Sequence, residues 1–216
     1  MTAQSINGWL RWLPAWPVYI MGAAWAGWLF WLAASGQLGA EPINRLEREY
    51  GQVAIKLIVL GLAVTPLRNL TKVSLLKFRR AIGVTAFGFV LAHFLVWVLL
   101  DVQSFARVWE EIVRRPYVTV GFAAFLLLIP LAVTSNNLSL RRLGAANWRR
   151  LHWLVYPAAI LGGVHYLWIA KVLELEPLLW MAAILGLLAL RINWAGVRQQ
   201  LRFGQGQGDS PNRQDS

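Results

Sequence analysis

Long apolar segments alternate with short polar ones along most of this 216-residue chain. A helix that crosses a bilayer needs about 20 mainly apolar residues. The pattern predicts six such helices, over approximately residues 14–34, 52–67, 81–100, 117–134, 151–170 and 177–193. We therefore expect an all-α integral membrane protein, with a six-transmembrane-helix bundle over residues 1–203 and a polar, disordered cytoplasmic tail over residues 204–216.

Basic residues gather in every second connection between the predicted spans. Segments 68–80 and 135–150, with the two ends of the chain, hold 14 basic and two acidic residues, a net charge of +12. The other connections hold six basic and eight acidic residues, a net charge of −2. Because Lys and Arg are enriched on the cytoplasmic side of membrane proteins, we expect both termini in the cytoplasm. An even number of spans agrees with that orientation.

The composition excludes several classes of protein. Hydrophobic residues make up 57% of the chain and charged residues only 14%, whereas a soluble domain has about 25% charged residues. The formal charge of +11 does not indicate nucleic-acid binding, because the basic residues flank apolar segments. The absence of cysteine excludes disulfides, thiol chemistry and iron–sulfur ligation by this chain. Most of the 13 tryptophans lie at predicted span ends, where they anchor helices at the interface.

The second predicted span contains a lysine. Lys56 lies in the second span, which is also the shortest. Its ammonium must either reach the interface or face the interior of the bundle.

Four features recur in the same order in two parts of the chain. Residues 62–65 and 131–134 both read LAVT, and each copy closes a span before a basic segment. The basic segments end in Arg79-Arg80 and Arg149-Arg150, and each is followed by a span that contains histidine. The second and third spans therefore resemble the fourth and fifth, as two copies of one helical hairpin.

All three histidines lie in the two repeat-related spans. They are His93, His152 and His165. His93 follows Arg80 by 13 residues and His165 follows Arg150 by 15, which places them at similar depths of roughly 20 and 22 Å along their helices. Two level histidines on neighbouring helices can ligate one haem iron from both faces. Without cysteine the haem would be non-covalent and b-type.

His152 lies near the start of the same span, 13 residues or about 20 Å from His165. That separation suits a second haem stacked across the membrane. However, the side chains of His152 and His165 would be about 140° apart around a straight helix. In addition, the residue that matches His152 in the other copy of the repeat is Ile82, which cannot ligate iron. His152 is therefore either an axial ligand or an interfacial group that binds an anionic headgroup or a cofactor phosphate.

Other signatures of chemistry are missing from the sequence. It contains no dinucleotide-binding glycine fingerprint, no P-loop and no paired catalytic carboxylates. Carboxylates near the middle of spans, which a proton pump would need, are also missing. These observations favour electron transfer through haem. Two alternatives are a stand-alone transmembrane reductase of ferric iron or another metal, and a non-redox transporter or structural protein whose histidines only pack.

Several segments resemble the MsrQ (YedZ) family, the haem-binding membrane subunits of the bacterial MsrPQ methionine sulfoxide reductase system. The resemblance extends over about residues 9–202. It is carried by LAVTPLRNL (62–70), FRRAIG (78–83), RPYVTVGF (115–122), LAVTSNN (131–137), RRLGAANWRRLHWLVY (141–156) and HYLW (165–168), with the span of His93.

This resemblance implies the membrane core of ferric reductases and NADPH oxidases, in the bacterial inner membrane. It implies one or two b-type haems on the histidines that match His93, His152 and His165, and a bound FMN. Electrons would enter from the quinone pool or a cytosolic flavin reductase. They would leave to MsrP, a periplasmic molybdopterin reductase subunit that repairs oxidised methionines and holds the catalytic centre.

The outer connections are candidates for docking that partner. Segments 35–51 and 101–116 are the longest on the predicted outer side. We expect Trp109, Glu110 and Glu111 to take part in docking.

Overall fold

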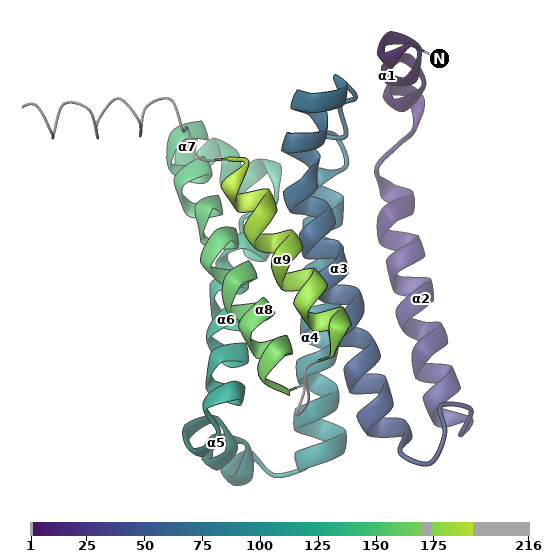
Figure 1. Cartoon of the computed structure of the whole chain (residues 1–216), viewed down its shortest axis with the longest axis vertical. Coiled ribbons are helices and arrows are strands. Elements are labelled where there is room, and N and C mark those ends of the chain that lie inside the picture. The colour runs from purple at the N-terminus through teal and green to yellow at the C-terminus, as the bar shows by residue number, and fades with distance from the viewer. Residues whose placement is uncertain (1, 170–173, 192–216) are drawn as a thin grey trace, which may run out of the picture.

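The computed structural model describes residues 2–169 and 174–191, and in these ranges all regular elements are helical (Figure 1). The predicted tail over residues 204–216 lies outside the described residues. The helices are α1 (Ala3–Trp12), α2 (Trp16–Ala34), α3 (Pro42–Thr71), α4 (Arg79–Val96) with a π-helical extension η1 (Trp97–Val102), α5 (Phe105–Arg114), α6 (Pro116–Val133), α7 (Asn137–Leu151) with a 3₁₀ turn η2 (His152–Leu154), α8 (Val155–Ile169) and α9 (Leu175–Ala189).

Within the described ranges, four helices are long and apolar enough to cross a membrane: α2, α3, α4 with η1, and α6. Helices α8 and α9 have 15 residues each, about 22 Å at 1.5 Å per residue. The chain is thus an all-α integral membrane protein. The count of six spans and the cytoplasmic position of both termini stay predictions.

Helix α3 begins ten residues before the predicted second span. Pro42 occupies its first turn, where the missing N–H costs no hydrogen bond. Arg45 and Glu49 form an i,i+4 ion pair of 2.8 Å, and Leu46 and Tyr50 are buried on the same face. Most of the expected outer segment 35–51 is therefore the first part of a 30-residue helix.

The expected basic connection 135–150 is also mainly helical. The Asn136 side chain caps α7 by accepting a hydrogen bond of 2.8 Å from the Ser139 N–H. Gly144 then interrupts the helix with a φ of 75°, a left-handed conformation that glycine adopts readily. Likewise, the outer segment 101–116 folds as η1 and α5, and only a few of its residues connect helices.

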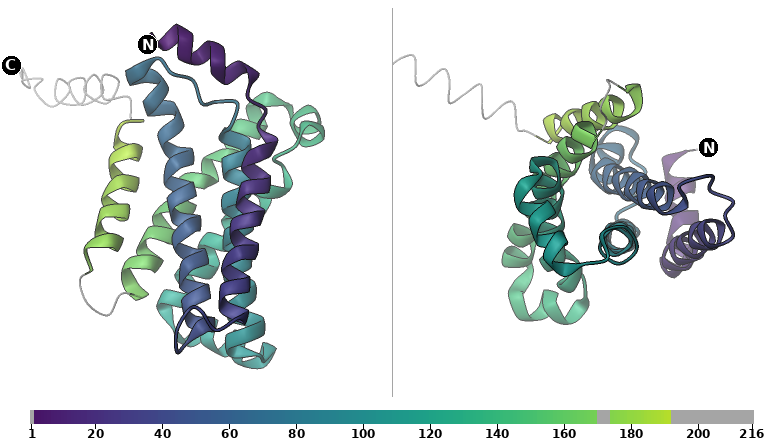
Figure 2. Two further views of the ribbon diagram at one scale, coloured as in Figure 1. Left: turned by 90° about the vertical axis from the view of Figure 1, so that its right-hand side faces the viewer. Right: turned by 90° about the horizontal axis from the view of Figure 1, so that it is seen from below.

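Two helix pairs form the centre of the bundle. Helix α3 packs along α4, and α6 packs along α8, more extensively than any other pair. These are the two hairpin copies of the sequence repeat. Helix α9 crosses over α3 and α8, while α2 lies on the outside against α3 and α4 (Figures 1 and 2). The main core cluster includes Ile58, Leu62, Leu131, Ala159 and Ile184.

The two ends of the bundle differ in charge as the sequence predicts. Helices α1 and α7 lie at one end, and α5 lies at the other (Figure 1). The described acidic residues all lie in three segments near the α5 end: 41–49 at the start of α3, 101–111 from η1 into α5, and 174–176 at the start of α9. The Arg pairs 79–80 and 149–150 lie at the α1 end, in the elements that connect there.

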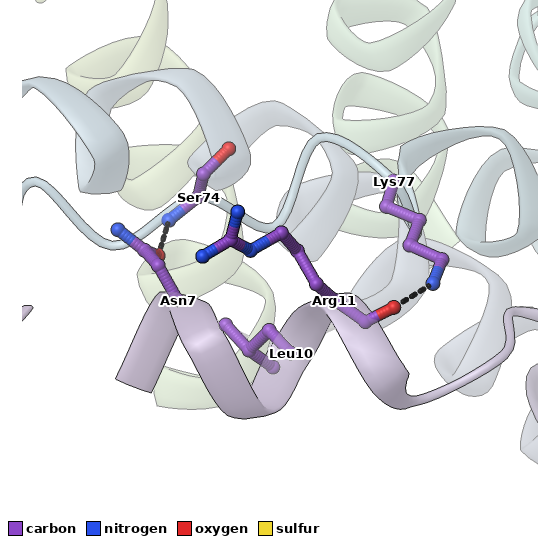
Figure 3. A pocket seen from close by; sticks show the side chains of 5 residues that line it. All are labelled: Asn7, Leu10, Arg11, Ser74 and Lys77. Carbon is purple, nitrogen blue, oxygen red and sulfur yellow. Dashed lines mark hydrogen bonds between the residues drawn. The ribbon is translucent and has the colours of Figure 1, made fainter. Parts of the chain in front are cut away.

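The short helix α1 turns away from the axis of α2 and is fastened to the connection before α4 (Figure 2). Asn7 donates to the Lys72 carbonyl and accepts from the Ser74 N–H, at 2.9 Å each. Lys77 donates to the Arg11 carbonyl at 2.7 Å, which satisfies a free carbonyl at the C-terminal end of α1. A shallow hollow between these residues holds about 290 Å³ (Figure 3).

Lys56 is partnered by the last described helix. Its ammonium lies 3.3 Å from Glu176 at the start of α9, and 6.0 Å from the ring centre of Trp180. The indole N–H of Trp180 donates to the same carboxylate at 3.3 Å. The side chain is half-exposed on the flank of the bundle, and a carboxylate of another helix pairs with its charge.

Candidate haem site

His93 lies on α4 and its ring points toward α3. The ring packs over Gly51, where an added methyl carbon would lie 3.3 Å from Nδ1. Nδ1 lies 2.8 Å from the main-chain carbonyl of Glu47, one helical turn before Gly51. Helix α3 therefore holds this imidazole with backbone groups only.

His165 lies on α8 and is held by α6 in the same way. A methyl carbon added at Gly121 would lie 2.6 Å from its Nδ1, which is closer than carbon and nitrogen can pack. Nδ1 lies 2.7 Å from the main-chain carbonyl of Tyr117, again one turn before the glycine. Both copies of the hairpin thus hold their histidine with a glycine and with the carbonyl four residues earlier.

These hydrogen bonds set the tautomer of both rings. A carbonyl oxygen can only accept, so Nδ1 of His93 and of His165 must carry the proton. The lone pair of each neutral ring is then on Nε2. A metal-bound histidine usually donates its other N–H to a carbonyl or a carboxylate, which fixes the ring and raises its basicity. Both imidazoles are therefore prepared to bind a metal through Nε2.

The two rings lie beside each other in the bundle. Their centres are 6.2 Å apart and their planes are at 77°. Because metal–imidazole bonds are about 2.0 Å, two imidazoles on opposite sides of one metal ion have ring centres about 6.3 Å apart. The observed separation therefore fits one metal ion between the rings, and the donor set of two imidazoles fits haem iron.

A cluster of phenylalanine rings lies between α4 and α6. Phe94, next to His93, lies 4.7 Å from Phe125 and 5.9 Å from Phe122, measured between ring centres. Phe87 stacks parallel to Phe125 at 6.0 Å. Through Phe94, this apolar cluster adjoins the helical turn that carries His93.

His152 lies apart from the pair, on η2 at the other end of α8. Its Nδ1 lies 3.0 Å from the Trp148 carbonyl, and its ring stacks on Trp148 with centres 3.7 Å apart. Nε2 lies 3.4 Å from the Ser135 hydroxyl, whose proton goes to the Leu131 carbonyl at 2.6 Å. The buried Ile82 at the matching position of the repeat provides no ligand. Among the described residues, no three His, Cys, Asp or Glu side chains come together as a metal site.

Sequence reasoning did not identify the backbone groups that hold the rings. Gly51 precedes the first LAVT segment by 11 residues and Gly121 precedes the second by 10. An alignment on the Arg pairs 79–80 and 149–150, which are 70 positions apart, pairs Gly51 with Gly121 and also pairs the residues four positions earlier, Glu47 and Tyr117. A glycine inside a helix costs about 0.5–1 kcal/mol relative to alanine, so its presence in both copies was a signal of close packing.

Comparison with known proteins identifies the family of the chain. The model of the family described as "Ferric reductase like transmembrane component" matches residues 50–163, the range from Gly51 to just before His165. A relative from Agrobacterium fabrum is 42% identical over 185 residues, which covers 84% of this chain and 86% of the relative. Relatives from Brucella ovis and Brucella canis are 42% identical over 178 residues, which covers 82% of this chain and 80% of each.

All three relatives are named "Protein-methionine-sulfoxide reductase heme-binding subunit MsrQ". The chain belongs to the MsrQ family. Membership agrees with the all-helical membrane bundle. No solved structure matches the chain significantly.

Proposed function

We propose that this chain is a membrane electron-transfer subunit that binds haem b between His93 and His165. It passes electrons from the cytoplasmic side or from the quinone pool to a periplasmic molybdopterin methionine sulfoxide reductase, MsrP, which repairs oxidised proteins. The observation that supports it most is the ring separation of 6.2 Å between two imidazoles whose Nδ1 atoms are both held by carbonyls.

The protein residues have defined tasks in this function. His93 and His165 ligate through Nε2, and the carbonyls of Glu47 and Tyr117 keep both rings in the required tautomer. Haem iron, when bound, supplies reversible one-electron chemistry between its ferric and ferrous states.

His152 and FMN belong to the proposal as secondary elements. The neighbour of His152 Nε2 is the Ser135 hydroxyl at 3.4 Å, which donates its proton elsewhere. This nitrogen can therefore ligate a second iron or contact an anionic cofactor. FMN is the cofactor that the resemblance to the MsrQ family implies. The catalytic centre for methionine sulfoxide lies on the partner, and the bacterial inner membrane is the location.

Absorption spectra of the purified protein test the haem assignment. The oxidised and dithionite-reduced spectra of the parent should be of b type. His93→Ala and His165→Ala should lose that spectrum, whereas His152→Ala should keep a substantial part. A parent without a Soret band, or three variants with unchanged spectra, would overturn the proposal and favour a transport or structural role.

A stand-alone metal reductase is a second candidate, because the matching family model describes a ferric-reductase-like component. The two functions differ in their need for a partner. If the reduced, haem-loaded chain reduces a ferric chelate rapidly without MsrP, and reduces MsrP slowly, the metal reductase is favoured.

A further inference from the structure

Helix α1 presents an apolar face that the rest of the described chain does not cover. Trp9 and Trp12 are 76% and 90% exposed. The value for Trp12 is the highest of any large hydrophobic side chain in the described ranges. Burying an indole removes a large apolar area from water, so two neighbouring uncovered indoles indicate that something else lies against this face.

The residues of α1 divide into two opposite faces. At 100° per residue, the larger apolar residues of the helix occupy an arc of about 160°: Ile6, Trp9, Leu10 and Trp12. The longer polar residues occupy an opposite arc of about 60°: Gln4, Asn7 and Arg11. A short helix with an apolar face, a polar face and little net hydrophobicity is typical of helices that lie in the plane of a membrane surface.

The polar face is occupied by the chain itself. Asn7 makes two hydrogen bonds with the connection before α4, and Lys77 of that connection donates to the Arg11 carbonyl. Figure 3 shows these contacts, with Leu10 beside them at the hollow. The hydrogen bonds fix the rotation of α1 about its own axis, so Trp9 and Trp12 are held away from this connection.

The bend between α1 and α2 places the two indoles near the edge of the bilayer. Helix α2 has 19 residues, about 28 Å at 1.5 Å per residue, which nearly equals the hydrocarbon thickness of roughly 30 Å. Its first residue, Trp16, therefore lies at the boundary of the hydrocarbon. Leu13 is extended, with a ψ of 119°, as expected before Pro14, so the chain leaves the axis of α2 there. Trp12 is four residues from Trp16 and thus at most about 14 Å away.

The charges around α1 are all positive. Arg11 on the helix and Lys72 and Lys77 on the connection beside it are exposed, and residues 1–40 and 50–100 contain no acidic residue. Anionic phospholipids attract basic groups near a membrane surface. A leaflet with anionic headgroups therefore fits both features, because its acyl boundary accepts the indoles and its phosphates meet the basic side chains.

We propose that α1 is a membrane-surface anchor. The helix lies in the headgroup region of the leaflet on the basic side of the bundle, with Trp9 and Trp12 at the acyl boundary, and anionic phospholipid strengthens the contact. Through the hydrogen bonds of Asn7 and Lys77, the anchor also holds the connection before α4 at the membrane surface. This role goes beyond the proposed electron transfer and does not depend on haem.

Single nitroxide labels test the position of α1, because the chain has no cysteine. The full chain is reconstituted in nanodiscs of phosphatidylcholine and phosphatidylglycerol. Power-saturation EPR then compares collisions with oxygen, which concentrates in lipid, and with a neutral nickel chelate, which stays in water. Labels at Trp9→Cys and Trp12→Cys should have an oxygen-to-nickel ratio several-fold above that of Gln4→Cys on the polar face. Their ratio should approach that of Leu126→Cys, an exposed position within the apolar helix α6.

Charge-matched variants test the preference for anionic lipid. Omitting phosphatidylglycerol should lower the ratio at Trp12→Cys, and adding Arg11→Gln with Lys72→Gln should abolish this dependence on lipid. Arg141→Gln with Arg142→Gln removes the same charge from exposed positions on α7 and should leave the dependence unchanged. Thermal unfolding of every variant reports whether the fold is retained.

Three results would contradict the proposal. If the labels at residues 9 and 12 collide with the nickel chelate as readily as the label at residue 4, this face lies in water, where it is free to dock a soluble protein. If neither reagent reaches them, another part of the protein covers the face. Equal ratios with and without phosphatidylglycerol would overturn the preference for anionic lipid.

Discussion

The imidazole of His165 lies so close to Gly121 that a methyl carbon there would be 2.6 Å from Nδ1. The matching distance between His93 and a methyl carbon at Gly51 is 3.3 Å. Both glycines thus allow an imidazole to approach the backbone of a neighbouring helix, where it finds the carbonyl that sets its tautomer.

Gly121→Ala should displace His165 and weaken haem binding strongly. Overpacking of this kind costs about 1–3 kcal/mol, which lowers affinity about 5- to 150-fold. Gly51→Ala should act in the same direction but less, because the neighbour needs to move only slightly. Haem titration of the apoprotein, followed by the Soret band, measures both. Gly27→Ala on α2, where no atom lies within 4 Å, is the control and should bind haem as the parent does.

The side chains of Glu47 and Tyr117 should be dispensable for haem binding, since only their carbonyls contact the histidines. Glu47→Gln and Tyr117→Phe should keep the reduced-minus-oxidised spectrum and the haem content of the parent. Pyridine haemochrome assays with both variants check this. Loss of haem in Glu47→Gln would show that the carboxylate, and not the backbone, determines the state of His93.

The ion pair between Lys56 and Glu176 should contribute to the stability of the protein, so the effects of substituting the two residues should not be additive. Lys56→Met leaves a carboxylate without its cation on the flank of the bundle, and Glu176→Gln leaves the ammonium alone. We expect a coupling of about 0.5–1 kcal/mol, because the pair is half-exposed and such couplings in membrane proteins are modest. Thermal unfolding of both single variants and the double variant completes the cycle. Purely additive effects would show that the pair contributes nothing.

Helix α5 should contact the partner protein through an apolar stripe. Phe105, Trp109 and Val113 are 79%, 66% and 64% exposed at i,i+4 spacing, while Val108 and Ile112 pack onto the bundle. Glu110 and Glu111 form ion pairs of 2.9 and 2.8 Å with Arg114 and Arg115, so neighbouring arginines already compensate their charges. Trp109→Ala should raise the dissociation constant for MsrP about tenfold.

Reversal of charge at Glu110 and Glu111 should also weaken binding of MsrP, but less than Trp109→Ala does. The effect should be seen mainly at low salt. The control is Trp153→Ala, since Trp153 is a similarly exposed tryptophan near the other end of the bundle. Unchanged electron transfer to MsrP in Trp109→Ala and in the charge-reversal variant would remove α5 from the docking surface.

The predicted orientation can be tested directly because the chain has no cysteine. Gln37→Cys and Asn147→Cys introduce single thiols at exposed positions at opposite ends of the bundle. In intact cells an impermeant maleimide should label Gln37→Cys, and Asn147→Cys should react only after the cells are opened. The reverse result would invert the topology, and with it the direction of electron flow.

Sequence periodicity identified the apolar helices but misplaced their ends. The second span was predicted to begin at residue 52, yet α3 begins at Pro42. Charged residues such as Arg45 and Glu49 conceal the helix in a hydropathy pattern, although they stabilise it by pairing. Segment 135–150 was expected to be a connection for a similar reason, since α7 is rich in polar and basic residues and gives no apolar run.

The sequence by itself determined the membrane class, the repeated hairpin, the segregation of charge and the two candidate histidines at similar depth. Hydropathy, charge and spacing are local properties, and the bilayer converts them directly into spans, orientation and depth. Only the tertiary structure decided which backbone groups hold the histidines, that Lys56 pairs with Glu176, and that Arg191 donates a hydrogen bond to the Leu62 carbonyl. These contacts join residues 46 to 129 positions apart, and helix packing, which no local pattern encodes, brings them together.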